Sequence, residues 1–179
     1  MKNKRIITVL AVLTLVIAVF FVVYVIQVIG SARGVKIDPH TYYKVMNVID
    51  GDTFEANISG KVITVRVLGI NTPETVDPRK PVECYGKEAS NEAKELLTGR
   101  KVRLEINPGR ELQDKYRRYL LYVYRDDGLF YNEFMIQNGF AHEYTFNHES
   151  YMYQNEFRKA EAAAKAGKLG LWNACSDSS

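Results

Sequence analysis

The residues best suited to chemistry lie in two short turns on either side of a predicted hairpin. Asp50–Thr53 reads Asp-Gly-Asp-Thr, Asn71–Glu74 reads Asn-Thr-Pro-Glu, and the strand leading to the second turn carries Arg66. Carboxylates brought together repel, so a cation usually has to compensate them. Calcium takes about six to eight hard oxygen ligands of this mixed kind, and an arginine fork matches the oxygens of a phosphate. The pattern therefore favours metal-assisted chemistry on a phosphate ester.

Each piece also has an ordinary interpretation. A lone Asp-Gly-Asp is common in plain turns, where Gly51 would take a positive φ. Arg66 lies on the strand face opposite to Ile63, Val65 and Val67, and taken alone it reads as a solvated or ion-paired strand residue. The two turns together favour the ion, because two carboxylates and an amide near one point are easier to explain with a cation than without one.

A second basic segment offers another phosphate-binding arginine. Asp114–Arg118 reads Asp-Lys-Tyr-Arg-Arg, and Arg118 is the second candidate clamp, with a solvated basic turn as the alternative. His142 and His148 have no supporting cluster and read as surface residues. With two cysteines and no Cys/His spacing, the sequence argues against zinc.

Short strands and a few helices must position these groups. Alternating or β-rich segments predict strands over 42–49, 53–58, 61–68, 101–106 and 119–124. Helical spacing predicts helices over 85–97 and 151–166, and a short helix capped by Asn132 that ends at residues 138–139. The pattern predicts an α+β, mainly β domain: a closed five-stranded barrel, of which the OB-fold is one kind, with three helices. A flatter α+β sandwich stays open.

The N-terminus predicts a membrane anchor. Residues 6–29 carry no charge and as a helix would exceed the hydrocarbon core of about 30 Å. The basic tip, residues 1–5, would stay in the cytoplasm and the rest would lie outside. Cleavage after residue 32, as in a secretory signal, is the alternative, and a buried core helix is a weaker one. Residues 30–40 then form a linker, 41–175 the globular domain and 176–179 a tail.

Overall charge gives no support for a polyanionic substrate. The net charge is +3, but three of the 24 basic residues precede the apolar stretch, which leaves 21 basic against 21 acidic residues. Cys84 and Cys175 lie 91 positions apart, and outside the cytoplasm such a pair is a disulfide candidate. The bridge would stabilise the fold by about 4 kcal/mol in the chain-entropy model. Two unpaired cysteines are the alternative.

Five motifs in order give the chain a strong resemblance to the thermonuclease, or staphylococcal nuclease-like, family. They are Val-Ile-Asp-Gly-Asp-Thr, Val-Arg-Val-Leu-Gly-Ile-Asn-Thr-Pro-Glu-Thr, Tyr-Gly-Lys-Glu-Ala, Asp-Lys-Tyr-Arg-Arg and Gly-Leu-Trp, and they span about residues 42–172. The resemblance implies an OB-fold barrel with three helices, and Ca²⁺-dependent hydrolysis of DNA and RNA that leaves 3′-phosphate ends.

The resemblance also implies a calcium site. Asp52 matches the direct carboxylate ligand, Thr72 a ligand through its carbonyl and Asp50 an outer-shell carboxylate. Asn71 stands where the family commonly has Asp; its amide oxygen can still ligate calcium, but one negative charge is lost. We therefore expect weaker calcium binding than in Asn71→Asp.

The remaining matches concern the reaction and the substrate. Glu74 matches the proposed general base, and Arg66 and Arg118 match the residues that bind the scissile phosphate. Lys115 and Tyr116 match positions that hold a substrate phosphate. Two further positions complete the comparison: Tyr144 as the aromatic that packs on a base (packing under the last helix is the alternative), and Arg117 in place of a glycine before the catalytic arginine.

The sequence thus predicts a membrane-anchored, extracytoplasmic, Ca²⁺-dependent endonuclease of low sequence specificity, secreted if its N-terminal segment is cleaved. Single-stranded DNA and RNA are the preferred partners, because a splayed base stacks more easily. No protein partner is implied and a monomer is expected. The main rival is an OB-fold module that binds nucleic acid with little or no catalysis, and a third hypothesis is a nuclease that uses another metal.

Overall fold

The computed structural model describes residues 13–25, 35–75 and 81–175, and the chain divides into two units, Met1–Lys36 and Ile37–Ser179. In the first unit, residues 13–25 form a helix with exposed apolar side chains. No described helix is both long and apolar enough to be a membrane span. The predicted anchor over 6–29 extends beyond these residues at both ends, and the basic tip and the tail lie outside them, so the anchor stays a prediction.

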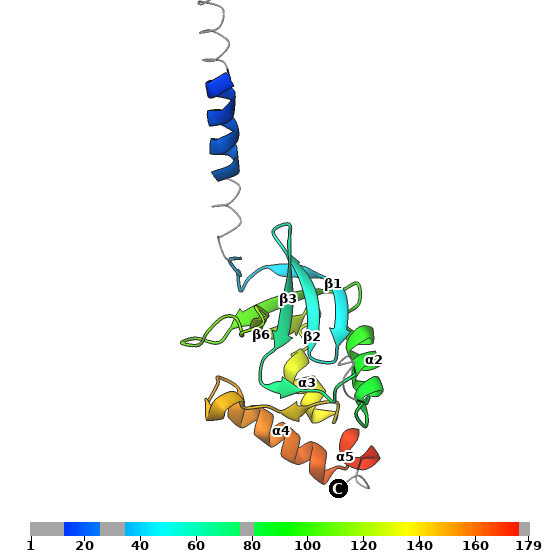
Figure 1. Ribbon diagram of the computed structural model, residues 1–179. Coiled ribbons are helices and arrows are strands. Elements are labelled where there is room, and N and C mark those ends of the chain that lie inside the picture. Colours follow the sequence, from blue (N-terminus) through cyan, green and yellow to red (C-terminus); the bar gives the residue numbers. More distant parts are fainter. Residues whose placement is uncertain (1–12, 26–34, 76–80, 176–179) are drawn as a thin grey trace, which may run out of the picture. The chain divides into compact units, whose positions relative to one another are not determined.

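The second unit is built on a closed five-stranded barrel, as predicted, and not on a flatter sandwich (Figure 1). The strand order is β1-β2-β3-β6-β5, and β1 pairs with β5 to close the barrel. Neighbouring strands are antiparallel except β3 and β6, which are parallel. The predicted strand ends hold to within one residue: β1 Tyr42–Asp50, β2 Thr53–Ile58, β3 Lys61–Val67, β5 Lys101–Ile106 and β6 Tyr119–Arg125.

The β2–β3 hairpin fixes where Arg66 lies. Ser59 and Gly60 both have positive φ, 51° and 88°, as a two-residue turn that matches strand twist requires. Ile58 therefore pairs with Lys61, and the register carries through to Thr53 opposite Arg66. The alternating residues Ile63, Val65 and Val67 are buried in the barrel. Arg66 thus lies outside the barrel core, next to the first acidic turn.

The helices surround one end and one side of the barrel (Figure 1). Helix α2 contacts β1, and α3 contacts β6, α4 and β4. A two-stranded sheet, β4 with β7, was not predicted, nor were two short helices, η1 and α5. The bounds are β4 Ile70–Asn71, α2 Gly86–Leu97, α3 Tyr131–Gln137, β7 His142–Glu143, η1 Phe146–His148, α4 Gln154–Ala166 and α5 Leu171–Ala174.

Two predicted helix starts are wrong. Asn132 does not cap α3, because it is the second residue of the helix and is fully buried. Its Oδ1 accepts a hydrogen bond from the Val123 amide, and its Nδ2 donates to the Leu68 carbonyl. Helix α4 begins at Gln154 and not at residue 151, and the Tyr151 hydroxyl donates to the carboxylate of Glu143. Both polar side chains thus join separate elements near the site.

Candidate active site

One open cleft of about 970 Å³ runs beside the barrel, between the two acidic turns and the segment that follows β5. Every residue that the sequence suggested for metal, catalysis or substrate lines it. They come from five separate stretches of chain, so the fold and not local sequence brings them together. These lining residues are Asp50, Asp52, Arg66, Asn71, Thr72, Glu74, Lys115, Tyr116, Arg118 and Tyr144.

Asp52 joins the two turns. Its Oδ2 accepts a hydrogen bond from the Thr72 amide at 3.0 Å and pairs with Arg66 Nη2 at 3.1 Å. Its Oδ1 accepts from the Thr53 hydroxyl at 2.8 Å. The side chain is only 11% exposed, and burying an unpaired carboxylate costs several kcal/mol. The arginine and the amide therefore hold this charge in place.

Asp50 lies in the same acidic region. Its Oδ1 accepts hydrogen bonds from the Gly51 amide and the Thr75 hydroxyl, both at 2.8 Å. Burial is the main cause that raises the pKa of Asp50, with smaller contributions from the charges of Asp52 and Glu74, while its hydrogen bonds work in the opposite direction. The negative charges of Asp52 and Glu74 therefore repel that of Asp50, and a bound cation would reduce this repulsion.

Gly51 lets the two turns touch. A Cβ added there would lie 2.6 to 2.9 Å from side-chain atoms of Thr72. The positive φ expected of an ordinary turn is wrong, because Gly51 is not among the glycines with positive φ. From the protein interior, the Tyr131 hydroxyl donates to the Gly51 carbonyl at 2.6 Å. Burial raises the pKa of Tyr131 and the charge of Asp52 adds to this, so the hydroxyl keeps its proton.

Arg66 is fixed by the backbone as well as by charge. Its Nη1 donates to the carbonyls of Val67 at 3.0 Å and Ile70 at 2.8 Å, and its Nη2 donates to Asn71 Oδ1 at 3.0 Å. Its side chain is 12% exposed. We call Asp52, Arg66, Asn71 and Thr72 the cleft floor; its members are linked by bonds that do not depend on a ligand.

The second turn is held at Glu74 by a residue that the sequence did not suggest. The Glu74 amide donates to Glu83 Oε2 at 2.9 Å, and the Glu83 amide donates to the Glu74 carbonyl at 2.9 Å. Helix α2 begins against the same turn, since a Cβ on Gly86 would lie 3.2 Å from the carbonyl oxygens of Pro73 and Glu74. Glu83 and the start of α2 therefore set the position of Glu74.

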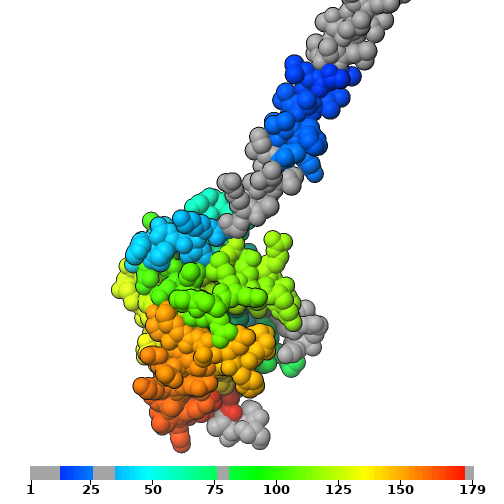
Figure 2. All heavy atoms as spheres, turned by 90° about the vertical axis from the view of Figure 1, so that its left-hand side faces the viewer, coloured from blue at the N-terminus to red at the C-terminus, as the bar shows by residue number. Residues whose placement is uncertain are grey.

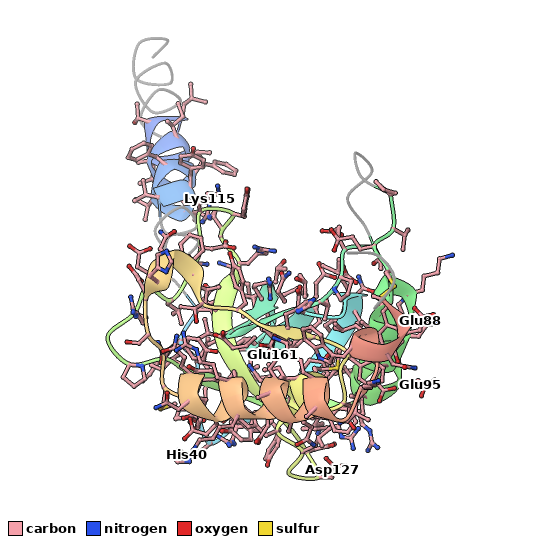
Figure 3. All side chains as sticks on the ribbon, turned by 90° about the horizontal axis from the view of Figure 1, so that it is seen from below. His40, Glu88, Glu95, Lys115, Asp127 and Glu161 are labelled. Atoms are coloured by element: carbon pink, nitrogen blue, oxygen red, sulfur yellow. A yellow bond between two sulfur atoms is a disulfide. The ribbon has the colours of Figure 1, made fainter. Side chains whose placement is uncertain are left out.

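Residues 114–118 form the opposite side of the cleft, which we call the cleft rim. Arg118 donates to Asp114 Oδ2 from Nε at 2.8 Å and from Nη2 at 2.7 Å, and its side chain is 32% exposed. Lys115 and Arg118 lie over the ring of Tyr116. In Figure 3 Lys115 lies at the tip of its turn, on the opposite side of this unit from Glu88 of α2.

Arg117 gives the rim an unusual backbone. It has a φ of 65°, in the left-handed region where a side chain is unfavourable. The amide of Arg117 donates to the Asp114 carbonyl at 2.8 Å, and the Asp114 side chain accepts from the amides of Tyr116 and Arg118. Asp114 therefore organises the rim, although the sequence suggested it only as part of a polar turn.

Aromatic residues close one end of the cleft. Tyr144 and Phe146 are 43% and 61% exposed, and their ring centres lie 6.5 Å apart. Arg110, from the segment after β5, pairs with Glu149 and donates to the Ser150 carbonyl. Figure 2 shows these two segments against each other, the first green and the second orange. Tyr144 is thus available at the cleft, and the alternative that it only packs under the last helix does not fit its exposure.

The two cysteines form a disulfide. Cys84 and Cys175 are bonded with their Cα atoms 5.9 Å apart, which is within the usual range. The bridge joins the segment before α2 to the residue after α5. No free cysteine occurs in the described part of the chain.

The oxygen atoms on the cleft floor suit a hard cation. Across residues 13–25, 35–75 and 81–175, no three His, Cys, Asp or Glu side chains are grouped closely enough to hold a metal. An ion here would need the Asn71 amide oxygen and the Thr72 carbonyl besides the carboxylates, a mixture that calcium accepts. The buried Thr72 Oγ1 also lacks a described hydrogen-bond partner. The residues present therefore fit calcium, completed by water or substrate oxygens.

Comparisons with known proteins identify the family of this small barrel protein with its charged cleft. Residues 64–174 match the family described as Staphylococcal nuclease homologue. The chain is 41% identical over 131 residues to a thermonuclease of Staphylococcus hyicus, and 41% identical over 130 residues to a thermonuclease of Staphylococcus intermedius. Each match covers 73% of this chain and 75% of the relative.

A third relative is the endonuclease YncB of Bacillus subtilis (strain 168). It is 40% identical over 125 residues, which are 70% of this chain and 58% of the relative. The extent and level of these matches decide the classification. The chain belongs to the staphylococcal nuclease family, as its sequence motifs indicated.

Proposed function

We propose that this protein is an extracytoplasmic, Ca²⁺-dependent endonuclease that cleaves DNA and RNA with low sequence specificity and leaves 3′-phosphate ends. The membership of the chain in a family of thermonucleases and endonucleases makes it a nuclease of the hydrolase class. One observation carries the proposal. The carboxylate of Asp52 binds both Arg66 and the amide of Thr72, so one cleft joins acidic oxygens to the arginine proposed to bind phosphate.

The cleft floor would hold the metal. Asp52, Asn71 and the Thr72 carbonyl supply the nearest oxygens, and Asp50 adds charge from behind. Calcium, when bound, supplies Lewis-acid and template chemistry at the phosphate. Arg66 would keep its place beside the ion because the carbonyls of Val67 and Ile70 hold its guanidinium independently of Asp52.

Three side chains would act on the ester. Water is a poor nucleophile, and the Glu74 carboxylate would accept its proton as it attacks phosphorus. Arg118 would donate to the equatorial oxygens, where negative charge builds up. Arg66 uses its four Nη hydrogens on the floor, so it would donate through Nε or exchange its Asn71 or Asp52 bond for a phosphate oxygen. Without substrate, Arg118 pairs with Asp114. When substrate binds, two phosphate oxygens would be a further anionic partner for the Arg118 guanidinium.

The surroundings of the cleft suit a flexible polyanion. Lys115 and the 67% exposed Tyr116 lie on the rim, and Tyr144 offers an exposed ring at the other end. Contacts to phosphate carry no sequence information, and an aromatic face accepts every base. Low specificity and a preference for single strands follow, because an unpaired base reaches the ring without being unstacked.

The location outside the cytoplasm is part of the same proposal. The uncharged residues 6–29 behind a basic tip favour an anchor with the nuclease unit outside, and a disulfide is typical of that compartment. Protease treatment of intact cells should digest the nuclease unit in the membrane fraction. Activity found in the medium with a new N-terminus near residue 33 would instead show a cleaved signal, and a protected unit would refute the location.

The activity has a direct test. The full chain, purified in mild detergent as the expected monomer, is incubated with single-stranded DNA or RNA, with calcium or with a chelator. We expect cleavage with calcium only, products with 3′-phosphate ends, and a loss of about 10²- to 10⁴-fold in Glu74→Gln. Glu55→Gln, on β2 outside the cleft-lining set, is the control. DNA that is bound but uncut in every condition would show a binding module, and full activity with another divalent ion alone would show a different metal.

A further inference from the structure

The two turns of the active site are held in different ways. The first turn rests on buried groups of the barrel and α3, including the Tyr131 hydroxyl beneath Gly51. The second turn ends at Glu74, whose backbone amide and carbonyl are both bonded to Glu83. Glu83 lies nine positions along the chain. The proposed general base thus takes its position from a residue outside the barrel strands.

Glu83 is in turn next to a covalent link. Cys84 is bonded to Cys175, at the end of α5. In this way the disulfide fastens the chain on which Glu83 lies to the C-terminal segment. Gly86 then starts α2 against the carbonyls of Pro73 and Glu74. A displacement of Cys84 would therefore move its neighbours Glu83 and Gly86, which contact the second turn directly.

The C-terminal segment is itself well fixed. The Leu171 amide donates to the Gly139 carbonyl at 2.9 Å. The backbones approach so closely that a Cβ on Gly170 would lie 2.3 Å from the Gly139 carbonyl oxygen. The ring of Trp172 meets His142 edge-on at 4.8 Å, and His142 pairs with Asn71 across β4 and β7. This segment therefore touches β7, whereas Asn71 at the start of the second turn is held by its own pairing with β7 and by Arg66.

We propose that Glu83 is a positioning residue for Glu74, and that the Cys84–Cys175 disulfide keeps Glu83 in place so that cleavage depends on the oxidised state of this pair. The proposal rests on the proposed function, since it needs Glu74 as the base. Reduction by a dithiol transfers two electrons and two protons to the bridge; it yields thiols at Cys84 and Cys175 and a disulfide in the reductant. The cleft floor has its own bonds and should keep its calcium affinity.

The first test uses two variants of the full chain at Glu83. In Glu83→Gln the amide oxygen can still accept from the Glu74 amide, whereas in Glu83→Ala nothing can. We expect kcat on single-stranded DNA to fall roughly 10- to 100-fold in Glu83→Ala, as for misplaced catalytic groups and lost supporting contacts. Glu83→Gln should stay within a few-fold of the parent. KM and calcium affinity should change little in both.

The second test asks whether the disulfide acts through Glu83. The double variant Cys84→Ser/Cys175→Ser and the reduced parent should lose kcat by a similar factor, with calcium affinity kept as evidence that the floor is folded. Because both changes act on one contact, adding Glu83→Ala to the cysteine variant should cost little more. The cysteine variant itself should not respond to reductant, which excludes a side effect of the reagent.

Three outcomes would overturn the proposal. The first is full kcat in a folded Glu83→Ala. The second is an equal loss of kcat in Glu83→Ala and Glu83→Gln. The third is a loss of kcat in the combined variant that equals the product of the separate losses from Glu83→Ala and from the cysteine substitutions. If the cysteine variant does not fold, the Glu83 pair still decides about the positioning residue, and the reduced parent decides about the bridge. Full activity in Glu74→Gln would refute the base itself and so the proposed function; loss there together with full activity in Glu83→Ala would refute this inference alone.

Discussion

The cleft floor and the cleft rim carry similar groups but are built differently. On the floor, Arg66 is 12% exposed and its bonds reach two backbone carbonyls besides Asp52. On the rim, Arg118 is 32% exposed and pairs with Asp114, four positions earlier in the same turn. The floor contacts of Asp52 to Arg66 and Thr72 join distant parts of the chain, whereas the Arg66 bonds to nearby carbonyls and the rim contacts are local. The comparison suggests that the floor is preorganised for charge, while the rim can adapt to a flexible strand.

The largest effects should come from the two arginines. Arg66→Lys and Arg118→Lys should each lower kcat/KM by about 10²- to 10³-fold, because lysine cannot replace the planar guanidinium and its several fixed donors. The free energy of unfolding should separate them. Arg66→Lys leaves Asp52 and two carbonyls poorly paired and should cost about 2 kcal/mol. Arg118→Lys weakens a partly buried but local pair and should cost less than about 1 kcal/mol.

Cleavage kinetics and urea unfolding of the full chain measure both quantities. Arg100→Lys, at an exposed pair with Asp126 on the surface, is the matched control and should change neither. If Arg66→Lys and Arg118→Lys were equally destabilising, the distinction between floor and rim would be lost.

A smaller effect is expected at Asn71. An aspartate there would add a second anionic oxygen to the floor beside Asp52, and we expect calcium to bind about 10-fold more tightly, as ligand charge sets affinity. Titration calorimetry measures this directly. Asn47→Asp, at an exposed position on β1, adds the same charge elsewhere and should leave the affinity unchanged. Equal calcium affinities in Asn71→Asp and the parent would contradict the assignment of Asn71 to the metal site.

The smallest effect belongs to the rim backbone. Arg117 has a φ of 65°, and relief of such strain is worth on the order of 1 kcal/mol. Arg117→Gly should therefore unfold at slightly higher urea, with part of the gain offset by the greater freedom of glycine in the unfolded chain. Cleavage should stay within a few-fold, since Arg118 keeps Asp114 as its partner. A clear loss of stability would show that the Arg117 side chain has contacts worth more than the strain.

The barrel could be predicted because its signals are local. Alternating apolar residues gave the strands, and the two-residue turn at Ser59 and Gly60 fixes the hairpin register. Counting back from that turn places Thr53 opposite Arg66, so the proximity of Arg66 to Asp52 was available from the sequence. Strand parity alone gave only the side of the strand on which Arg66 lies.

The missed features depend on contacts between distant residues. The pairing of β4 with β7 joins Asn71 to His142 through two-residue strands, which are too short to show a period. Asn132 resembled a helix cap because polar residues favour caps, but tertiary bonds to Val123 and Leu68 decide its place. Glu83 gave no signal, because its role comes from the return of the chain to Glu74.

The central claim is that oxygens from both turns meet at one divalent ion. Diffraction from crystals of the full chain grown with calcium, recorded for the anomalous signal of that metal, tests it most directly. The account predicts one strong peak on the cleft floor, within ligand distance of the Asp52 carboxylate and the Thr72 carbonyl. A peak bound elsewhere, or an empty floor in crystals whose protein cleaves DNA only with calcium, would contradict it.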